Sequence, residues 1–273
     1  HKSRKARYFM PTFSHARLPV DTQRYLQHIG FTGAARPDLP TLQQLHHRHM
    51  LSVPFENLSI IYHQGIQLAP EALFSKVIER NRGGFCYELN ALFALLLREI
   101  GFKVSFISGE IRARDGHFGP PYDHLALRVD LAGQAWLVDV GFGDSFLTPL
   151  KIVAAEPQPQ ASGTFHLERE GDYYLLERRN GDQRSHAKTL YRFTVQPREL
   201  HEFDEMCRFH STSPQSHFTQ RLVCSRPTNH GRVTLSDMKL IVTEDHQRHE
   251  TTLHSEEERR AALWQHFAID LDR

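Results

Sequence analysis

The sequence has few cysteines, almost no net charge and no long hydrophobic run, and each shortage argues against a class of protein. The three cysteines among its 273 residues, Cys86, Cys207 and Cys224, are odd in number and far apart. This pattern argues against a disulfide scaffold and predicts reduced thiols in a cytoplasmic compartment. The 33 basic and 32 acidic residues nearly cancel, so the chain lacks an overall field that would attract nucleic acid or a membrane.

Membrane-spanning and targeting patterns are also missing. No apolar stretch approaches the length that crosses a bilayer, and none has the character of a signal-peptide core. The one basic run lies within residues 1–9, which we interpret as an N-terminal extension or a cloning remnant rather than a nucleic-acid arm. We therefore expect neither a nucleic-acid nor a membrane partner, and the sequence leaves monomer and homodimer open.

The residue pattern changes from helical to strand-like near residue 102. Apolar spacing predicts helices over 21–28, 41–53, 70–79 and 86–100, with Thr41 as a possible cap of the second. Further helices are expected over 199–208 and 255–267. Alternating or β-branched residues predict strands over 104–107, 123–130, 135–140, 164–176, 189–195, 218–224 and 233–243, with a turn at Asn180-Gly181. Helices followed by strands of a curled sheet or small barrel indicate an α+β fold.

Three closely spaced histidines, His46, His47 and His49, raise the question of a metal site. No carboxylate or cysteine pattern with ligand spacing accompanies them. We therefore interpret them as a solvated helix face and expect no metal.

The stretch Asn81-Arg82-Gly83-Gly84-Phe85-Cys86-Tyr87-Glu88-Leu89-Asn90 places a cysteine where two glycines give way to an apolar helix. A thiol in the first turn of a helix feels unpaired backbone amides and the positive end of the helix dipole, which favour the nucleophilic thiolate. Most buried cysteines are simply small hydrophobic residues, so the rest of the sequence must decide. Cys86 is the first candidate nucleophile.

A histidine and an aspartate follow on two adjacent predicted strands. If the turn occupies residues 131–134, His124 lies opposite Gly141, and Asp139 is two residues away on the same face. Such diagonal neighbours are about 7 Å apart at the backbone, within reach of an imidazole and a carboxylate. A cysteine, histidine and aspartate in this order support thioester chemistry of the papain-like type. Spacing alone leaves hydrolase and transferase undecided.

The segment from Arg82 to Asn90 resembles the active-site motif of the arylamine N-acetyltransferases. Four other stretches fit the same family in order: Pro54-Phe55-Glu56-Asn57-Leu58, His124-Leu125, Val138-Asp139-Val140-Gly141-Phe142-Gly143 and Ser211-Thr212-Ser213-Pro214-Gln215-Ser216-His217-Phe218. The resemblance implies a papain-like core divided into a helical bundle over 10–101, a β-barrel over 102–197 and an α/β lid over 198–273. It also implies a ping-pong transfer from acetyl-CoA to arylamines, arylhydrazines or N-hydroxyarylamines.

The resemblance assigns roles to individual positions. It implies a catalytic triad of Cys86, His124 and Asp139, and substrate contacts from Phe142 and Phe85. Contacts with CoA are implied for Gly141, Gly143, Thr212 and Ser216, and supporting roles behind the site for Arg82, Glu56 and Asn57. One departure concerns the CoA contacts, because Cys207 stands where many members have asparagine. A papain-like or transglutaminase-like thiol hydrolase remains the alternative function, and a non-catalytic binding protein is disfavoured by the intact triad.

Overall fold

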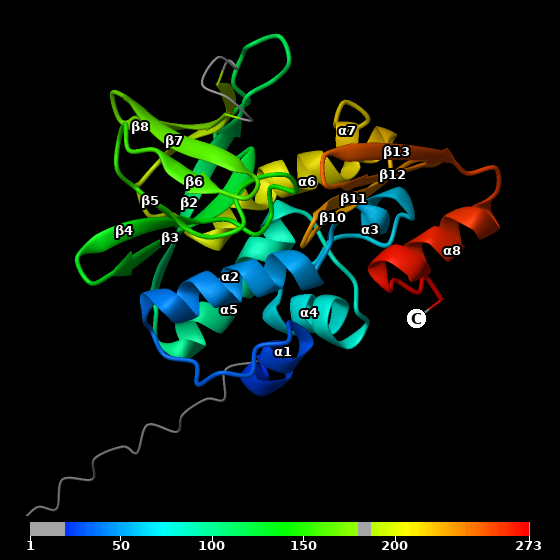
Figure 1. Cartoon of the computed structure of the whole chain (residues 1–273), viewed down its shortest axis with the longest axis horizontal. Coiled ribbons are helices and arrows are strands. Elements are labelled where there is room, and N and C mark those ends of the chain that lie inside the picture. Colours follow the sequence, from blue (N-terminus) through cyan, green and yellow to red (C-terminus); the bar gives the residue numbers. More distant parts are fainter. Residues whose placement is uncertain (1–19, 180–186, 273) are drawn as a thin grey trace, which may run out of the picture.

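The computed structural model describes residues 20–179 and 187–272 and has a helical part and two antiparallel sheets (Figure 1). The extension over 1–9 and the turn expected at Asn180-Gly181 lie outside these residues. The helical part consists of α1 (Thr22–His28), α2 (Leu39–Ser52), α3 (Leu58–Ile61), α4 (Pro70–Phe74), the π-helical η1 (Ser75–Glu79) and α5 (Cys86–Ile100). The helices expected from apolar spacing are thus present, although Asp38 rather than Thr41 caps α2.

The larger sheet has eight strands in the order β5-β4-β3-β2-β9-β8-β7-β6. Its strands are β2 (Lys103–Ile111), β3 (His124–Leu131), β4 (Gln134–Val138), β5 (Leu150–Lys151), β6 (Gln158–Gln160), β7 (Gly163–Glu170), β8 (Tyr173–Arg179) and β9 (Lys188–Thr194). Its two edges meet through side chains, since Gln158 accepts from the Lys151 amide at 2.7 Å and donates to its carbonyl at 3.0 Å. The sheet is therefore a nearly closed barrel.

The smaller sheet has five strands in the order β1-β10-β11-β12-β13. They are β1 (Phe55–Glu56), β10 (Val223–Thr228), β11 (Gly231–Ser236), β12 (Lys239–Glu244) and β13 (Gln247–Thr252), with α8 (Glu256–Phe267) following. The segment before them holds η2 (Leu200–Phe203), α6 (Asp204–Thr212) and α7 (His217–Gln220). Since β1 pairs with β10, a motif from the first third of the chain completes a sheet built from the last third.

Three expected elements in this last part are wrong. The strand expected over 218–224 is α7 followed by β10. The strand expected over 233–243 is the hairpin of β11 and β12, which turns at Asp237 with a φ of 50°. Strand β13 was not expected, because all six of its residues are exposed and it carries no hydrophobic alternation.

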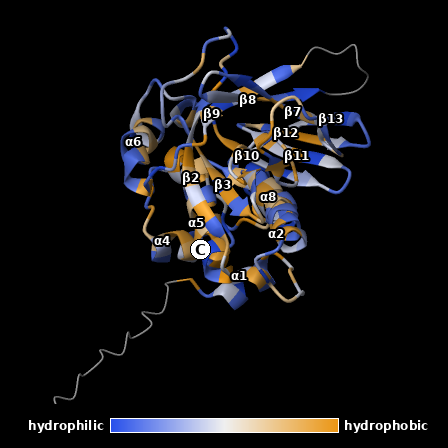
Figure 2. Cartoon of the chain, turned by 90° about the vertical axis from the view of Figure 1, so that its left-hand side faces the viewer, coloured by the Kyte–Doolittle hydropathy of each residue, from blue (hydrophilic) through white to orange (hydrophobic). Residues whose placement is uncertain are grey.

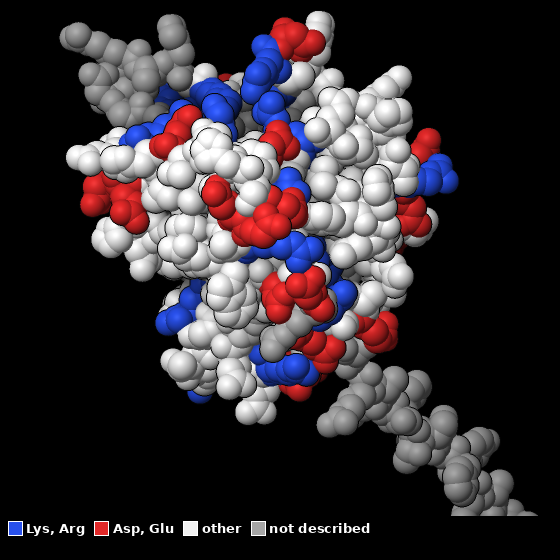
Figure 3. Space-filling view, turned by 90° about the vertical axis from the view of Figure 1, so that its right-hand side faces the viewer, with Lys and Arg blue, Asp and Glu red and all other residues white. Residues whose placement is uncertain are grey.

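The main core lies where α5 packs against the first barrel strands, and contacts between α5 and both β2 and β3 join the helical part to the barrel. Eleven of the fifteen residues of α5 are buried. Hydrophobic residues concentrate in this interior, and hydrophilic ones at the periphery (Figure 2). On the face that carries α8, acidic and basic residues are interspersed (Figure 3). The site residues therefore sit on buried elements held from both sides.

Candidate active site

The cysteine singled out by the sequence is the first residue of α5 and is 5% exposed. The helix begins with Glu88 folded back, so that its carboxylate accepts from the Phe85 amide at 3.3 Å. A Cβ at Gly84 would lie 2.7 Å from that carboxylate, which explains the need for glycine there. The thiol of Cys86 therefore lies at a capped, fixed helix N-terminus, where backbone dipoles favour negative charge.

His124 and Asp139 meet as the strand register predicted. Residues 127 and 131 pair with 138 and 134, which carries His124 to the level of Gly141. The Nε2 of His124 lies 2.7 Å from Oδ2 of Asp139, and the two residues are 2% and 0% exposed. Because the carboxylate only accepts, Nε2 carries the proton and Nδ1 is left for the thiol of Cys86.

The carboxylate of Asp139 has three further donors. The Tyr191 hydroxyl donates to Oδ2 at 2.9 Å, and the Asn90 amide and the Gly141 backbone amide each donate to Oδ1 at 2.9 Å. Asn90 lies on the same face of α5 as Cys86 and also accepts from Val140 at 3.0 Å. Both oxygens are thus held, and the nucleophile helix itself positions the aspartate.

This environment sets the charge of the pair. Burial disfavours the imidazolium, but the charge and hydrogen bond of Asp139, with help from Cys86, outweigh it and raise the pKa of His124 to about 10. Burial likewise opposes ionisation of Asp139, yet His124, Asn90 and the Gly141 amide together lower the pKa of the carboxyl. The arrangement therefore favours a protonated histidine beside an ionised aspartate.

The loop that follows Asp139 passes close to the thiol. A Cβ at Gly141 would lie 2.7 Å from the Cys86 Cα, so only glycine permits this approach. Gly143 adopts a φ of 92° and faces the ring of Phe55. Between them, the half-buried ring of Phe142 lies edge-on to His124, with centroids 5.5 Å apart. Phe142 is thus placed where a flat substrate would meet the histidine.

The other predicted substrate contact, Phe85, is fully buried. Its ring packs edge-on against Tyr87 and Phe218, at centroid distances of 5.0 and 5.8 Å. Phe218 in turn contacts the half-buried Phe55 at 6.1 Å. Phe85 therefore lies beneath the aromatic surface, which Phe55 and Phe218 form in its place.

Arg82, Glu56 and Asn57 make the bracing contacts that their sequence context suggested. Arg82 pairs with Glu56 at 2.9 Å, with side chains 3% and 0% exposed, and Glu56 also accepts from the amide of Gly83 at 3.2 Å. Asn57 holds the later segment, since its amide donates to the carbonyls of Phe218 and Arg221 at 2.8 and 2.7 Å. These contacts fix the glycine turn before Cys86 and join it to the smaller sheet.

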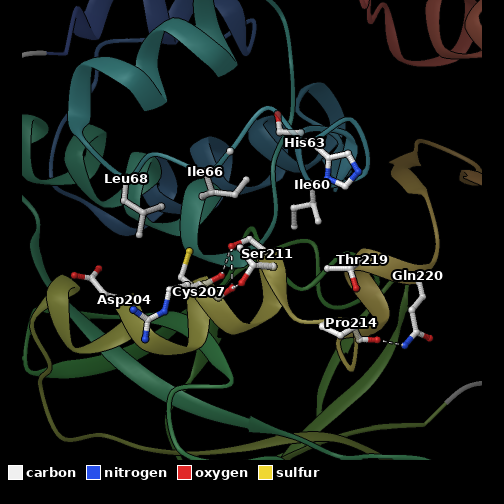
Figure 4. A pocket seen from close by; sticks show the side chains of 14 residues that line it. Ile60, His63, Ile66, Leu68, Asp204, Cys207, Ser211, Pro214, Thr219 and Gln220 are labelled. Atoms are coloured by element: carbon white, nitrogen blue, oxygen red, sulfur yellow. Dashed lines mark hydrogen bonds between the residues drawn. The ribbon is translucent and has the colours of Figure 1, made fainter.

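Two of the predicted CoA contacts lie apart from the glycine loop. Thr212 lines a cavity of about 780 Å³ between α3 and α6, together with Cys207, Ser211, Ile60 and other residues, and none of the three triad residues lines it (Figure 4). Ser216 is 2% exposed, and its hydroxyl caps α7 and contacts His210. Only Gly141 and Gly143 adjoin the thiol and its aromatic surroundings.

The expectation of a solvated histidine face is wrong for His46 and His49, which are both fully buried. His46 contacts the Leu147 carbonyl through Nδ1 at 2.9 Å and accepts from the Asp139 amide through Nε2 at 3.3 Å. Burial lowers the pKa of His46 to about 4, so the ring is neutral. In residues 20–179 and 187–272 no group of three potential ligands is placed to hold a metal ion. No helix in that part of the chain has the length and apolarity to cross a bilayer.

Sequence reasoning missed Asn90, Tyr191 and His46 as neighbours of Asp139. Asn90 carried a signal, because it lies four residues after Cys86 and so shares its helix face. Tyr191 and His46 carried none, since they lie 52 and 93 residues from Asp139 in the sequence and meet it only through the barrel and α2.

Comparison with known proteins agrees with this geometry. Residues 38–273 match a family model described as N-acetyltransferase. An arylamine N-acetyltransferase of Mycolicibacterium smegmatis is 35% identical over 93% of this chain and 94% of that protein. Arylamine N-acetyltransferase 1 of Homo sapiens is 31% identical over 93% of this chain and 96% of that protein.

Solved structures agree as well. The arylamine N-acetyltransferase of Salmonella typhimurium superposes with a TM-score of 0.86 at 27% identity, covering 92% of this chain and 93% of that one. The Mycobacterium marinum enzyme in complex with CoA gives a TM-score of 0.84 at 29% identity, covering 91% of this chain and 93% of that one. The similarity therefore extends over nearly the whole fold.

Proposed function

Because the chain belongs to the arylamine N-acetyltransferase family, we propose that it transfers an acetyl group from acetyl-CoA to arylamines, arylhydrazines and N-hydroxyarylamines. The observation that carries the proposal is the placement of Cys86 at the N-terminus of α5 beside the buried His124–Asp139 pair. The CoA held by the M. marinum relative supports acetyl-CoA as the donor. Cys86 is the nucleophile, His124 the proton carrier, and Asp139 fixes the orientation of the imidazole.

In the first half-reaction the Cys86 thiolate attacks the acetyl carbonyl carbon. A bond forms between Sγ and that carbon, and the bond to the sulfur of CoA breaks. The leaving CoA thiolate takes the proton held on His124, whose raised pKa keeps the imidazolium populated at neutral pH. The backbone amide of Cys86 serves as one donor to the developing oxyanion. The product is a thioester on Cys86.

In the second half-reaction the acceptor nitrogen attacks the thioester carbon, and the bond to Sγ breaks. An aromatic amine is neutral at pH 7, so its lone pair is available without prior deprotonation. His124, now neutral, removes the proton from the attacking nitrogen, which restores the imidazolium and thiolate. Phe142 supports a flat acceptor at this point, because its half-buried ring lies edge-on to His124. A closely packed aromatic surface also limits access of water to the thioester.

Finer roles follow from the same geometry. Gly141 and Gly143 let the loop after Asp139 approach the donor. Thr212 and Ser216 are weaker candidates for direct CoA contacts, because one lines a separate cavity and the other is buried. The buried pair of Arg82 and Glu56 holds the turn before the nucleophile.

We also propose a papain-like core, in which α5 presents the nucleophile to strands that carry the other two residues. The packing of α5 against β2 and β3 supports it. In this proposal 10–101 forms the helical part, 102–197 the barrel and 198–273 an α/β lid. The pairing of β1 with β10 attaches the last part directly beside the aromatic surface.

A thiol hydrolase with the same triad would resolve the thioester with water, so the test must separate donor from acceptor. Intact-protein mass is measured after acetyl-CoA alone and after addition of anisidine, with peptide mapping of Cys86. We expect a single acetyl adduct on Cys86 that disappears as acetylated anisidine forms. Cys86→Ala should form no adduct, and Cys224→Ala is the matched control, because Cys224 is a fully buried thiol in β10.

Absence of an acetyl adduct on a Cys86 that still reacts with iodoacetamide would contradict the proposal. An adduct that is lost to water at the same rate with and without the amine would favour the hydrolase.

A further inference from the structure

A second buried histidine stands beside the triad and takes no part in the proposed chemistry. His210 lies on α6, which crosses between the two sheets (Figure 1), and is 6% exposed. Its Nε2 lies 2.8 Å from Oδ1 of Asp123, and its Nδ1 lies 3.2 Å from the hydroxyl of Ser216. Because the carboxylate only accepts, Nε2–H donates to Asp123 and the Ser216 hydroxyl is left for Nδ1.

Serine, histidine and aspartate in this order also form hydrolase triads, but this cluster is not arranged for attack. Ser216 is 2% exposed, and its Oγ already accepts from the Phe218 amide at 3.3 Å as the cap of α7. A nucleophile must reach its substrate, so the cluster serves as a link between elements.

Asp123 immediately precedes His124, and it is held at both its backbone and its side chain. The hydroxyl of Tyr87, which follows Cys86, lies 2.8 and 3.1 Å from the carbonyls of Tyr122 and Asp123. The side chain of Asp123, 12% exposed, is held by His210 and by the Ile111 amide at 3.3 Å. The chain neighbours of Cys86 and His124 thus meet in one cluster.

We propose that His210 is a positioning residue that aligns His124 with Cys86 by fixing Asp123. The ring of His210 also packs against Tyr87, at a centroid distance of 6.3 Å, and against Phe218, at 5.5 Å. Loss of its hydrogen bonds leaves the carboxylate of Asp123 with one donor and frees the start of β3. A shift of a fraction of an ångström between thiol and imidazole suffices to slow the chemistry.

The test compares His210→Phe, His210→Gln and His217→Gln. Phenylalanine keeps a ring but removes both hydrogen bonds, whereas glutamine retains an amide donor for Asp123. His217 on neighbouring α7 is exposed and lies 6.3 Å from His210 between ring centroids, so it is the matched control. Where acetyl transfer is the readout, the inference rests on the proposed function. Alkylation of Cys86 by iodoacetamide, followed by peptide mapping from about pH 5 to 9, reads the thiol–imidazole pair without it.

We expect His210→Phe to slow Cys86 alkylation and acetylation about tenfold at neutral pH. The KM for acetyl-CoA should stay within about twofold, because an aligning role acts mainly on kcat. The pH profile of alkylation should change, and His210→Gln should recover most of the loss while His217→Gln matches the unaltered protein.

An unchanged alkylation profile in a folded His210→Phe would overturn the inference, even if acetyl-CoA is not the donor. So would equal losses in the phenylalanine and glutamine variants, which would indicate a requirement for imidazole itself. If His210→Phe does not fold, Asp123→Ala removes the same hydrogen bond from the other side and is expected to give the same change in profile. Wild-type alkylation in folded Asp123→Ala would then reject the alignment role.

Discussion

At the scale of single residues, the site depends on how completely Asp139 is surrounded by donors. His124, Tyr191, Asn90 and the Gly141 amide occupy both of its oxygens. A fixed carboxylate holds the imidazole in one tautomer and stabilises its charge. The sequence predicted the His124–Asp139 contact, because strand alternation and turn length determine register. It could not reveal Tyr191, which reaches the carboxylate from a strand whose position depends on the whole barrel.

This environment predicts a pH dependence of stability. The pKa of His124 is raised from 6.5 to about 10 in the folded protein, so its contribution is fully present below 6.5 and is lost as pH rises through 10. The lowered pKa of Asp139 adds no slope there, because that carboxyl is ionised in both states. Asp139→Asn removes the main cause of the raised pKa. The difference in free energy of unfolding between wild type and Asp139→Asn should therefore narrow from neutral pH to about pH 10, measured by urea denaturation.

A difference that stays constant or widens over this range would contradict the assigned charge state. Asp130→Asn provides the control, because its pair with Arg128 is about a quarter exposed and does not involve His124.

At the scale of elements, the start of α5 rests on two buried ion pairs. Lys76 from η1 pairs with Glu88 at 2.7 Å, and Arg82 pairs with Glu56 at 2.9 Å. The helix itself was predictable, since its apolar spacing, Gly84 and Gly101 mark both ends. The Lys76–Glu88 pair was not, because charged residues are normally expected at the surface. Likewise, α7 and β13 have too few apolar residues for their type to be read from periodicity.

Breaking one buried pair should be far more costly than breaking an exposed one. Glu56→Gln leaves the guanidinium of Arg82 buried without its counter-charge and places an amide near the Leu58 N–H, which Glu56 accepts at 2.6 Å. We expect a loss of about 3–5 kcal/mol in the free energy of unfolding. The control is Glu79→Gln, which breaks the exposed pair with Arg24 and should cost less than about 1 kcal/mol. Comparable losses in the two variants by urea denaturation would show that the buried pair is not a principal support.

At the scale of the whole molecule, the barrel closes through side chains next to the active-site loop. Gln160 accepts from the amides of Leu147 and Thr148 at 2.8 and 3.1 Å and donates to the Thr148 carbonyl at 2.8 Å. The loop that begins at Asp139 therefore ends at this closure, with His46 holding both ends from α2. An α+β chain with a curled sheet was predictable from the order of helices and strands. The closure was not, because it depends on amide side chains that meet only after the sheet has curved.

Gln160→Ala should therefore affect both stability and activity. It leaves two backbone amides and one carbonyl of the loop without their partner, which costs about 1–3 kcal/mol in the free energy of unfolding. Acetyl transfer should fall several-fold through a lower kcat, because the loop carries Asp139 and Phe142 at its other end. Gln247→Ala, at an exposed position of the edge strand β13, should change neither quantity. Urea denaturation and steady-state kinetics on both variants test the prediction. A destabilised Gln160→Ala with unchanged kcat would mean that the closure supports the barrel but does not position the loop.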